Sequence, residues 1–192
     1  GALELATRLA RSLSVELFAA TVTRLLVDLN RSAGHPAVFS RWSAALPEAE
    51  REQLLARWHT PHRTAIREAV ASAVEGGAAV MHVAVHSFTP VLDGVRRNAD
   101  IGLLYDPGRL RERAFASRWR SALRETAPSL RVRSNYPYRG VSDGLTRWLR
   151  RSFADAVYAG LELEMNQDLI GEPERWRDAT RAIDSSLRAC LD

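Results

Sequence analysis

The chain has 192 residues, of which 46% are hydrophobic and 26% are charged, the ordinary balance of a soluble globular protein. No apolar stretch approaches the roughly 18 to 20 residues that a membrane-spanning helix requires, so the composition argues against a membrane protein. All 27 basic residues are arginine and the net charge is only +4, so charge alone does not indicate an anionic partner.

Six segments repeat apolar residues with a period near 3.6 and are predicted to be α-helices. They are residues 3–13, 48–58, 61–77, 107–125, 143–160 and 173–191. Pro61 and Pro173 stand where the first turn of a helix accepts proline. Gly76 suits a C-terminal cap, and Asp143 suits an N-terminal cap. The first segment lacks the basic, apolar and small-residue pattern of a signal peptide, so we expect a cytoplasmic protein.

Short β-branched or apolar runs lie between the predicted helices and are predicted to be strands of a covered sheet. They are residues 19–30, 78–87, 99–106, 130–136 and 160–166. Since strand and helix alternate along most of the chain, we expect the α/β class, as a three-layer α/β/α sandwich around a mostly parallel mixed sheet. No linker or internal repeat interrupts this pattern, which favours a single domain over residues 1–192.

Polar side chains stand near the ends of predicted strands, where α/β folds build their ligand sites. His86 follows an almost unbroken apolar run, and Glu162 and Glu164 lie two apart on the last strand. Both carboxylates therefore point to one face of the sheet. A buried carboxylate needs a cation or a hydrogen-bond partner, which favours a functional site. An exposed face of an edge strand, or an ion pair with arginine, is the alternative interpretation.

The most basic stretch, residues 111–125, is the best candidate for binding nucleic acid. Its arginines alternate with acids and with an apolar stripe, so an amphipathic helix with a solvated arginine face is the preferred interpretation. We therefore expect no nucleic-acid partner. Cys190 is the only cysteine, which excludes an internal disulfide and is typical of a reducing compartment.

Five motifs, in their order along the chain, resemble the N-formylglutamate amidohydrolase family. They are VDLNR at 27–31, VHSFTP at 85–90, RNADIGLLYDP at 97–107, NYPYRG at 135–140 followed by SDG at 142–144, and YAGLELEMNQ at 158–167. The resemblance covers the chain from about Leu25 to Gln167. It implies the phosphorylase/hydrolase-like fold of the zinc carboxypeptidases and aspartoacylase. It also implies a zinc hydrolase that cleaves an acyl group from the nitrogen of an acidic amino acid.

The resemblance assigns roles to individual residues. His86 matches a zinc ligand at the end of a strand, and catalytic zinc takes three protein ligands with water in the fourth position. Glu164 matches the base that activates this water, with Glu162 as a supporting carboxylate. Arg24, which strand alternation places on the same side as Asp28, resembles the arginine that polarises the scissile carbonyl.

Two further pairs of residues are implied to bind the substrate. Asn30 and Arg31 match the residues that hold its carboxylate, a task that suits a guanidinium because it can donate two parallel hydrogen bonds. Tyr138 and Arg139, in the loop NYPYRG, are expected to line the pocket. A turn held by packed tyrosines is the alternative interpretation of this loop.

In the family, the other two zinc ligands come from a histidine and acid motif on a strand upstream of the helix with which this chain begins. That motif is missing here, so the resemblance implies a domain without its N-terminal strand and an incomplete zinc site. His59 and His62 have the spacing of metal ligands on one helical face, but Pro61 is expected to begin the helix and leave His59 outside it. His82 lies deeper in its apolar run, and we expect a hydrogen-bonded core histidine.

We therefore expect a zinc-dependent amidohydrolase that acts on N-formylglutamate or a similar small N-acyl acidic amino acid. The alternative is a non-catalytic domain that binds a small carboxylate or a partner protein. The sequence does not indicate the acyl group or the oligomeric state.

Overall fold

The computed structural model describes residues 1–191, which form two compact units. The first unit comprises residues 1–17, 81–141 and the chain from 159 onward, and the second comprises residues 18–80 and 142–158. Each unit has a hydrophobic core of its own. Within residues 1–191, no helix is long and apolar enough to cross a membrane.

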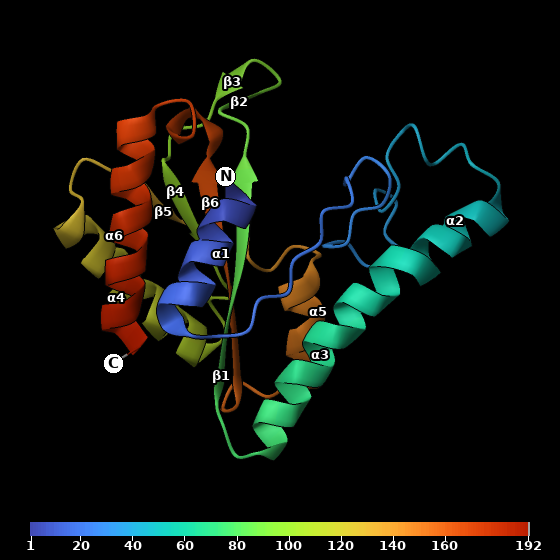
Figure 1. Cartoon of the computed structure of the whole chain (residues 1–192), viewed down its shortest axis with the longest axis horizontal. Helices are drawn as coiled ribbons and strands as arrows, with labels where there is room; N and C mark the ends of the chain where they lie inside the picture. Colours follow the sequence, from blue (N-terminus) through green and yellow to red (C-terminus); the bar gives the residue numbers. More distant parts are fainter. Residues whose placement is uncertain (192) are drawn as a thin grey trace. The chain divides into compact units, whose positions relative to one another are not determined.

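A four-stranded sheet, in the order β1-β6-β4-β5, runs through the first unit. Its strands are β1 (Val80–Phe88), β4 (Ile101–Leu104), β5 (Val132–Ser134) and β6 (Tyr158–Asn166). β4 pairs in parallel with β5 and antiparallel with β6, and the arrows of β1 and β6 point the same way in Figure 1. The sheet is therefore mixed and mostly parallel, which confirms the expected α/β class.

Three helices cover one face of this sheet (Figure 1). They are α1 (Ala2–Leu13), α4 (Leu110–Thr126) and α6 (Pro173–Leu191). Alternation along β6 turns Leu161, Leu163 and Met165 to this face, where all three are fully buried. Trp119 of α4 is also fully buried, and its indole Nε1 donates to the hydroxyl of Ser186 in α6 at 3.0 Å. This bond matters because a buried donor without an acceptor costs about 1 to 3 kcal/mol.

A small hairpin and a short helical turn complete the first unit. The hairpin pairs β2 (Val91–Leu92) with β3 (Val95–Arg96), and the turn is the 3-10 helix η2 (Gln167–Leu169). Asp93 and Gly94 join the hairpin strands with φ angles of 50° and 76°. A two-residue hairpin of this kind needs positive φ at both positions, which Asp followed by Gly adopts readily.

The second unit is built on one long helical segment and one short helix. The segment runs through α2 (Glu48–Leu54), a π-helical turn η1 (Leu55–His59) and α3 (Thr60–Glu75), and the short helix is α5 (Leu145–Ser152). Ile66 and Val70 of α3 share a core with Leu145 and Leu149 of α5. α3 ends with Gly76 as its C-cap, as expected from the sequence.

The strand predicted for residues 19–30 is wrong. These residues form turns and irregular backbone, because their amides bond locally: those of Leu26 and Val27 both donate to the carbonyl of Thr23. The amide of Asp28 bonds to the carbonyl of Val38 at 2.8 Å, in a segment that is not a strand either. An apolar run of this length forms a strand only if a neighbouring strand accepts its hydrogen bonds.

Two helix boundaries also differ from those predicted. The helix expected over residues 143–160 ends at Ser152, since Phe153 is extended and residues 158–160 belong to β6. Pro61 does occupy the first turn of α3, but η1 continues the helix upstream, so His59 lies inside it. A proline in a helix removes one hydrogen bond and crowds the preceding turn, and the wider π-helical turn lies directly before it.

Candidate functional site

The predicted metal ligand and the predicted base share one face of the sheet in the first unit. Along β1, Val83 and Val85 pack against the helix-covered core, so alternation turns His86 to the opposite face. β6 is the neighbour of β1, and the same alternation turns Glu164 to that opposite face. His86 and Glu164 therefore lie on the same side of adjacent strands.

The two glutamates of β6 are buried. Glu162 and Glu164 are 8% and 5% exposed, and β6 lies between β1 and β4. The alternative interpretation of an exposed edge strand is therefore wrong. Since a buried carboxylate is costly to desolvate, two of them on one sheet face mark it as a candidate site for catalysis or for binding a cation.

The loop at residues 135–140 packs against the sheet beside Glu164. Gly102 of β4 is the register partner of Glu164. A Cβ atom at Gly102 would lie 2.1 Å from the carbonyl oxygen of Tyr136 and 3.2 Å from Cβ of Glu164. Only glycine allows the backbone of Tyr136 to approach the strand this closely. Gly102 therefore allows the loop to pack next to Glu164.

Asn135 fixes both ends of this loop. Its Oδ1 accepts hydrogen bonds from the amides of Tyr105, at 3.2 Å, and Gly140, at 2.9 Å. Gly140 packs closely on the same strand end, since a Cβ atom there would lie 2.2 Å from the backbone nitrogen of Tyr105. The loop is therefore anchored at its base, and its tip carries the residues predicted to line a pocket.

Tyr138 and Arg139 form that tip. The hydroxyl of Tyr138 accepts a hydrogen bond from Arg97 at 3.0 Å, and the same guanidinium lies 4.9 Å from the centre of the tyrosine ring. This contact agrees with the alternative interpretation of a turn held by tyrosines. Arg139 is exposed and has no hydrogen bond or ion pair in the part of the chain that the structure describes. Its guanidinium is therefore available to a ligand.

In the second unit, the motif VDLNR forms a turn organised by Asp28. Its Oδ1 accepts a hydrogen bond from the amide of Asn30 at 3.1 Å, and its Oδ2 pairs with Arg24 at 2.6 Å. Arg24 thus reaches Asp28 across a turn of four residues and not by strand alternation, and its side chain is 71% exposed. This ion pair occupies part of the guanidinium that the resemblance assigns to the scissile carbonyl.

Asn30 and Arg31 are tied to the segment that begins α5. Oδ1 of Asn30 accepts a hydrogen bond from the amide of Leu145 at 2.8 Å, and Nη1 of Arg31 donates to the carbonyl of Asp143 at 3.1 Å. Neither side chain has another hydrogen bond or ion pair within residues 1–191. Nδ2 of Asn30 and Nε and Nη2 of Arg31 therefore remain as donors, which is what a carboxylate ligand requires.

Asp143, predicted to cap α5, binds Ser32 instead. The N-cap of α5 is Gly144, and the carboxylate of Asp143 accepts hydrogen bonds from the amide of Ser32, at 2.8 Å, and from its hydroxyl, at 2.6 Å. Burial alone raises the pKa of Asp143, but these hydrogen bonds and the charges of His35 and Arg31 lower it overall. Through these two hydrogen bonds the ionised carboxylate of Asp143 fixes Ser32, the residue that follows Arg31.

The histidines near this turn do not form a metal site. Nε2 of His59 lies 2.8 Å from the carbonyl oxygen of Arg31, which occupies that nitrogen. Burial lowers the pKa of both His59 and His62. No three histidine, cysteine, aspartate or glutamate side chains gather to hold a metal ion anywhere in the described residues. Since catalytic zinc takes three protein ligands, residues 1–191 do not fit a complete zinc centre.

Arg63 contacts the VDLNR turn, although no motif includes it. Its Nη1 lies within hydrogen-bond distance of the carbonyl oxygens of three consecutive residues of that turn. One signal in the sequence pointed to it: Arg63 precedes Ile66 by three residues and Val70 by seven, which places it on the apolar face of α3. An arginine on an apolar face needs a buried partner, but the sequence alone does not indicate which one.

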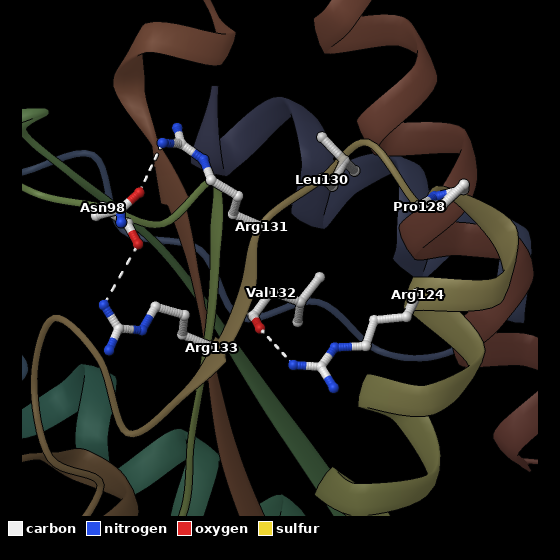
Figure 2. A pocket seen from close by; sticks show the side chains of 7 residues that line it. All are labelled: Asn98, Arg124, Pro128, Leu130, Arg131, Val132 and Arg133. Atoms are coloured by element: carbon white, nitrogen blue, oxygen red, sulfur yellow. Dashed lines mark hydrogen bonds between the residues drawn. The ribbon is translucent and has the colours of Figure 1, made fainter.

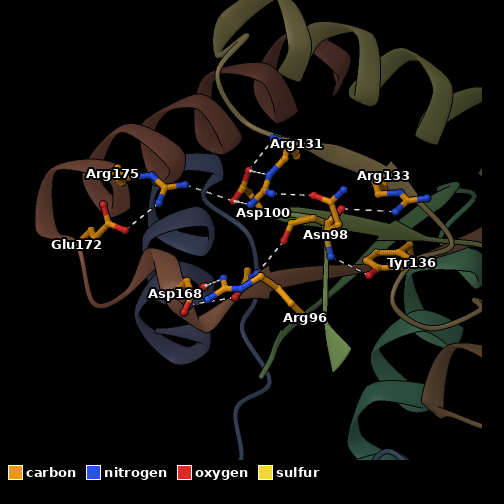
Figure 3. Close-up of polar contacts among 11 residues, drawn as sticks. Arg96, Asn98, Asp100, Arg131, Arg133, Tyr136, Asp168, Glu172 and Arg175 are labelled. Carbon is orange, nitrogen blue, oxygen red and sulfur yellow. Dashed lines mark hydrogen bonds and ion pairs between the residues drawn. The ribbon is translucent and has the colours of Figure 1, made fainter. Parts of the chain in front are cut away.

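Asp100 belongs to an ion-pair network of the first unit, shown in Figure 3. It is 2% exposed and accepts hydrogen bonds from the amide, Nε and Nη2 of Arg131 at 2.8, 3.0 and 2.9 Å. Arg175 of α6 adds a contact at 3.3 Å. Burial alone raises the pKa of Asp100, but Arg131 and Arg175 lower it overall. The network links α6 to the start of β5 and is structural.

A cavity of about 590 Å³ lies beside this network (Figure 2). Its lining residues are Asn98, Arg124, Pro128, Leu130, Arg131, Val132 and Arg133. Among its lining residues only Asn98 belongs to one of the five motifs, and its arginines bond mainly to nearby backbone and side-chain oxygens. None of the residues with a predicted catalytic, substrate-binding or metal-binding role lines this cavity.

Comparison with known proteins identifies relatives of the chain. The sequence profile of the N-formylglutamate amidohydrolase family matches residues 1–171. A solved gene product of Agrobacterium tumefaciens is 28% identical, with a TM-score of 0.80 over 99% of this chain and 76% of that one. N-formylglutamate amidohydrolase from Ralstonia eutropha JMP134 is 22% identical, with a TM-score of 0.75 over 99% and 80%, and shares the fold. Among curated proteins, none matches the chain.

Proposed function

Because the chain belongs to the N-formylglutamate amidohydrolase family, a family of hydrolases, we propose that it cleaves the amide bond of N-formylglutamate or a similar N-acyl acidic amino acid. The observation that carries the acidic substrate is the pair Asn30 and Arg31. Each side chain forms one hydrogen bond with the segment that begins α5, and the polar atoms that remain for a ligand are donors. Two neighbouring side chains with spare donors suit a carboxylate and disfavour a cationic or purely apolar ligand.

Glu164 is the proposed base. It takes a proton from the water that attacks the carbonyl carbon and passes it to the departing nitrogen, so that the C–N bond breaks and a carboxylic acid and an amino acid are released. Its place on the same sheet face as His86, on the neighbouring strand, supports this role. Glu162, on the same face, is the supporting carboxylate. Arg24 is the proposed partner of the scissile carbonyl, and Tyr138 and Arg139 are proposed to contact the substrate.

Zinc is the proposed metal, with His86 as the ligand that the resemblance assigns to this chain. His86 stands on the same sheet face as the glutamates, which supports the assignment. The residues described do not complete a zinc centre, so no step of the reaction is assigned to the metal. The spare donors of Asn30 and Arg31 also suit a second candidate function, namely a domain that binds a small carboxylate without hydrolysing it.

Binding and turnover of N-formylglutamate test both functions. We expect isothermal titration to show tighter binding of N-formylglutamate than of N-formylglutamine, whose side chain is uncharged. Arg31→Lys keeps the charge but loses the planar donor pair, so its affinity for N-formylglutamate should fall about tenfold, or roughly 1.4 kcal/mol. Arg147→Lys, at an exposed position of α5, is the matched control and should bind as the wild type does.

The outcomes separate the candidates. Release of formate from N-formylglutamate supports the hydrolase, whereas selective binding without formate release supports the binding domain. Equal affinity of the wild-type chain for the two ligands, or an unchanged affinity in Arg31→Lys, would overturn the acidic substrate.

A further inference from the structure

Arg63 is a buried cation without a carboxylate partner. It is 4% exposed, and none of the ion pairs within residues 1–191 includes it. Its Nη2 is buried and has no hydrogen-bond partner among the described residues. Burial lowers the pKa of Arg63, although the more distant charges of Asp143 and Asp28 oppose this effect. Burying a charged guanidinium costs desolvation free energy, so the contacts of Arg63 that offset this cost indicate its role.

Those contacts converge on the turn that carries Asn30 and Arg31. Nη1 of Arg63 lies 3.2 Å from the carbonyl oxygen of Leu29 and 3.0 Å from those of Asn30 and Arg31. The guanidinium also lies over the indole of Trp148 in α5, 4.7 Å from the ring centre. Three consecutive carbonyl groups that point at one cation fix the peptide planes on both sides of Asn30. The directions of the attached side chains are fixed with them.

His59 adds a second bond to the same turn. Its Nε2 lies 2.8 Å from the carbonyl oxygen of Arg31, which is also a partner of Arg63. A carbonyl oxygen can only accept, so Nε2 carries the hydrogen. Because burial lowers the pKa of His59, the ring is neutral at pH 7 and its proton resides on Nε2. One helical turn therefore presents two donors, His59 and Arg63, to the backbone of the turn.

We propose that Arg63, with His59, is a positioning residue that determines the preference for an acidic substrate. It acts through the backbone of Leu29, Asn30 and Arg31, while the side chains of Asn30 and Arg31 bond to the backbone of Leu145 and Asp143. The inference rests on the proposed function, in which these side chains bind the carboxylate. Arginine suits this place because its flat guanidinium stacks on Trp148 while the two hydrogens of Nη1 are shared among three carbonyl oxygens. A lysine ammonium is a compact point charge without a planar group to stack on the indole.

Two measurements on Arg63→Lys test this role. The first is the ratio of the dissociation constants for N-formylglutamine and N-formylglutamate, and we expect it to fall at least about tenfold. The second is hydrogen exchange at the amides of Asn30, Arg31 and Ser32, which have partners within the turn or on Asp143. These amides should exchange at least about tenfold faster, while the amides of α3 around Ile66 keep their protection.

Different results would overturn the proposed function and the positioning role of Arg63. A wild-type chain with no preference for N-formylglutamate would overturn the proposed function. A folded Arg63→Lys variant that keeps both the ligand preference and the slow exchange of the turn would overturn the positioning role alone. If Arg63→Lys does not fold, His59→Gln and His59→Ala replace it. Glutamine retains an N–H donor and should keep most of the preference, whereas alanine should lose part of it. Equal behaviour of these two variants would also overturn the proposal.

Discussion

Gly102 and Glu164 are partners across the antiparallel pair of β4 and β6, and the backbone of Tyr136 fills the space above Gly102. In Gly102→Ala, the new Cβ would lie 2.1 Å from the carbonyl oxygen of Tyr136, so the loop or the strand must shift. We predict a loss of roughly 1 to 3 kcal/mol in the free energy of unfolding, the usual effect of overpacking.

Thermal unfolding followed by circular dichroism measures this loss. For a chain of this size, each kcal/mol corresponds to a fall of about 2 to 4 °C in Tm. Gly34→Ala is the control, because a Cβ at Gly34 has no atom within 4 Å. If both variants have the Tm of the wild-type chain, the close approach of Tyr136 to β4 does not contribute to the stability of the fold.

Glu164→Gln tests the proposed base. The amide has nearly the same volume as the carboxylate but cannot accept a proton from water, so we predict that formate release from N-formylglutamate falls about 100-fold or more. Binding of N-formylglutamate, measured by titration, should stay near the wild-type value. Glu162→Gln, on the same sheet face, should have a smaller effect on turnover. Near-normal formate release by Glu164→Gln would remove this residue from the role of base.

The pH dependence of stability follows from His59. Burial, the largest effect, lowers its pKa below 6.5, the charge of Arg63 lowers it further, and the Arg31 carbonyl and Asp28 oppose these effects. Below pH 6.5 the unfolded chain therefore binds a proton that the folded chain does not. The free energy of unfolding should fall as the pH decreases from 6.5 toward the folded pKa, by at most about 1.4 kcal/mol per pH unit for each such histidine.

Urea unfolding at pH values between 7.5 and 5.5 checks this dependence. His59→Gln keeps a donor for the Arg31 carbonyl but does not titrate, so its stability should depend less steeply on pH than that of the wild type. His62, whose pKa burial also lowers, should account for part of the remaining slope. The same slope in His59→Gln and in the wild type would contradict the assignment of His59 as a buried neutral ring.

Zinc retention is the fourth prediction. Because no three ligand side chains gather within residues 1–191, this chain should keep well below one zinc ion per molecule after dialysis against a mild chelator. Elemental analysis measures the content, and His86→Ala shows whether any retained zinc depends on that histidine. Stoichiometric zinc that His86→Ala loses would show that this chain assembles a complete centre.

Local patterns in the sequence determined most of the regular structure, because helix and strand periodicity are properties of neighbouring residues. Alternation along residues 160–166 is enough to place Leu161 and Leu163 on one face of the strand and Glu162 and Glu164 on the other. The order of five motifs identified the family, since motif residues are read directly from the chain. Residues 19–30 form no strand although they are apolar, because an apolar run carries no information about whether a partner strand exists.

Only the tertiary structure decided how the turn that carries Asn30 and Arg31 is held. The bonds of Asn30 to Leu145 and of Arg31 to Asp143 join residues more than 110 positions apart, and no local pattern predicts such pairs. The sequence indicated Asp143 as a helix cap because aspartate bonds well to free amides, but in the fold its carboxylate accepts a hydrogen bond from the amide of Ser32. The spacing of Arg63 places it on the apolar face of α3, but its three carbonyl partners come from a turn more than 30 positions away, and only the fold brings them together. The sequence determines which hydrogen-bonding groups each segment carries. The packing of segments that are distant in the sequence determines which of these groups come into contact.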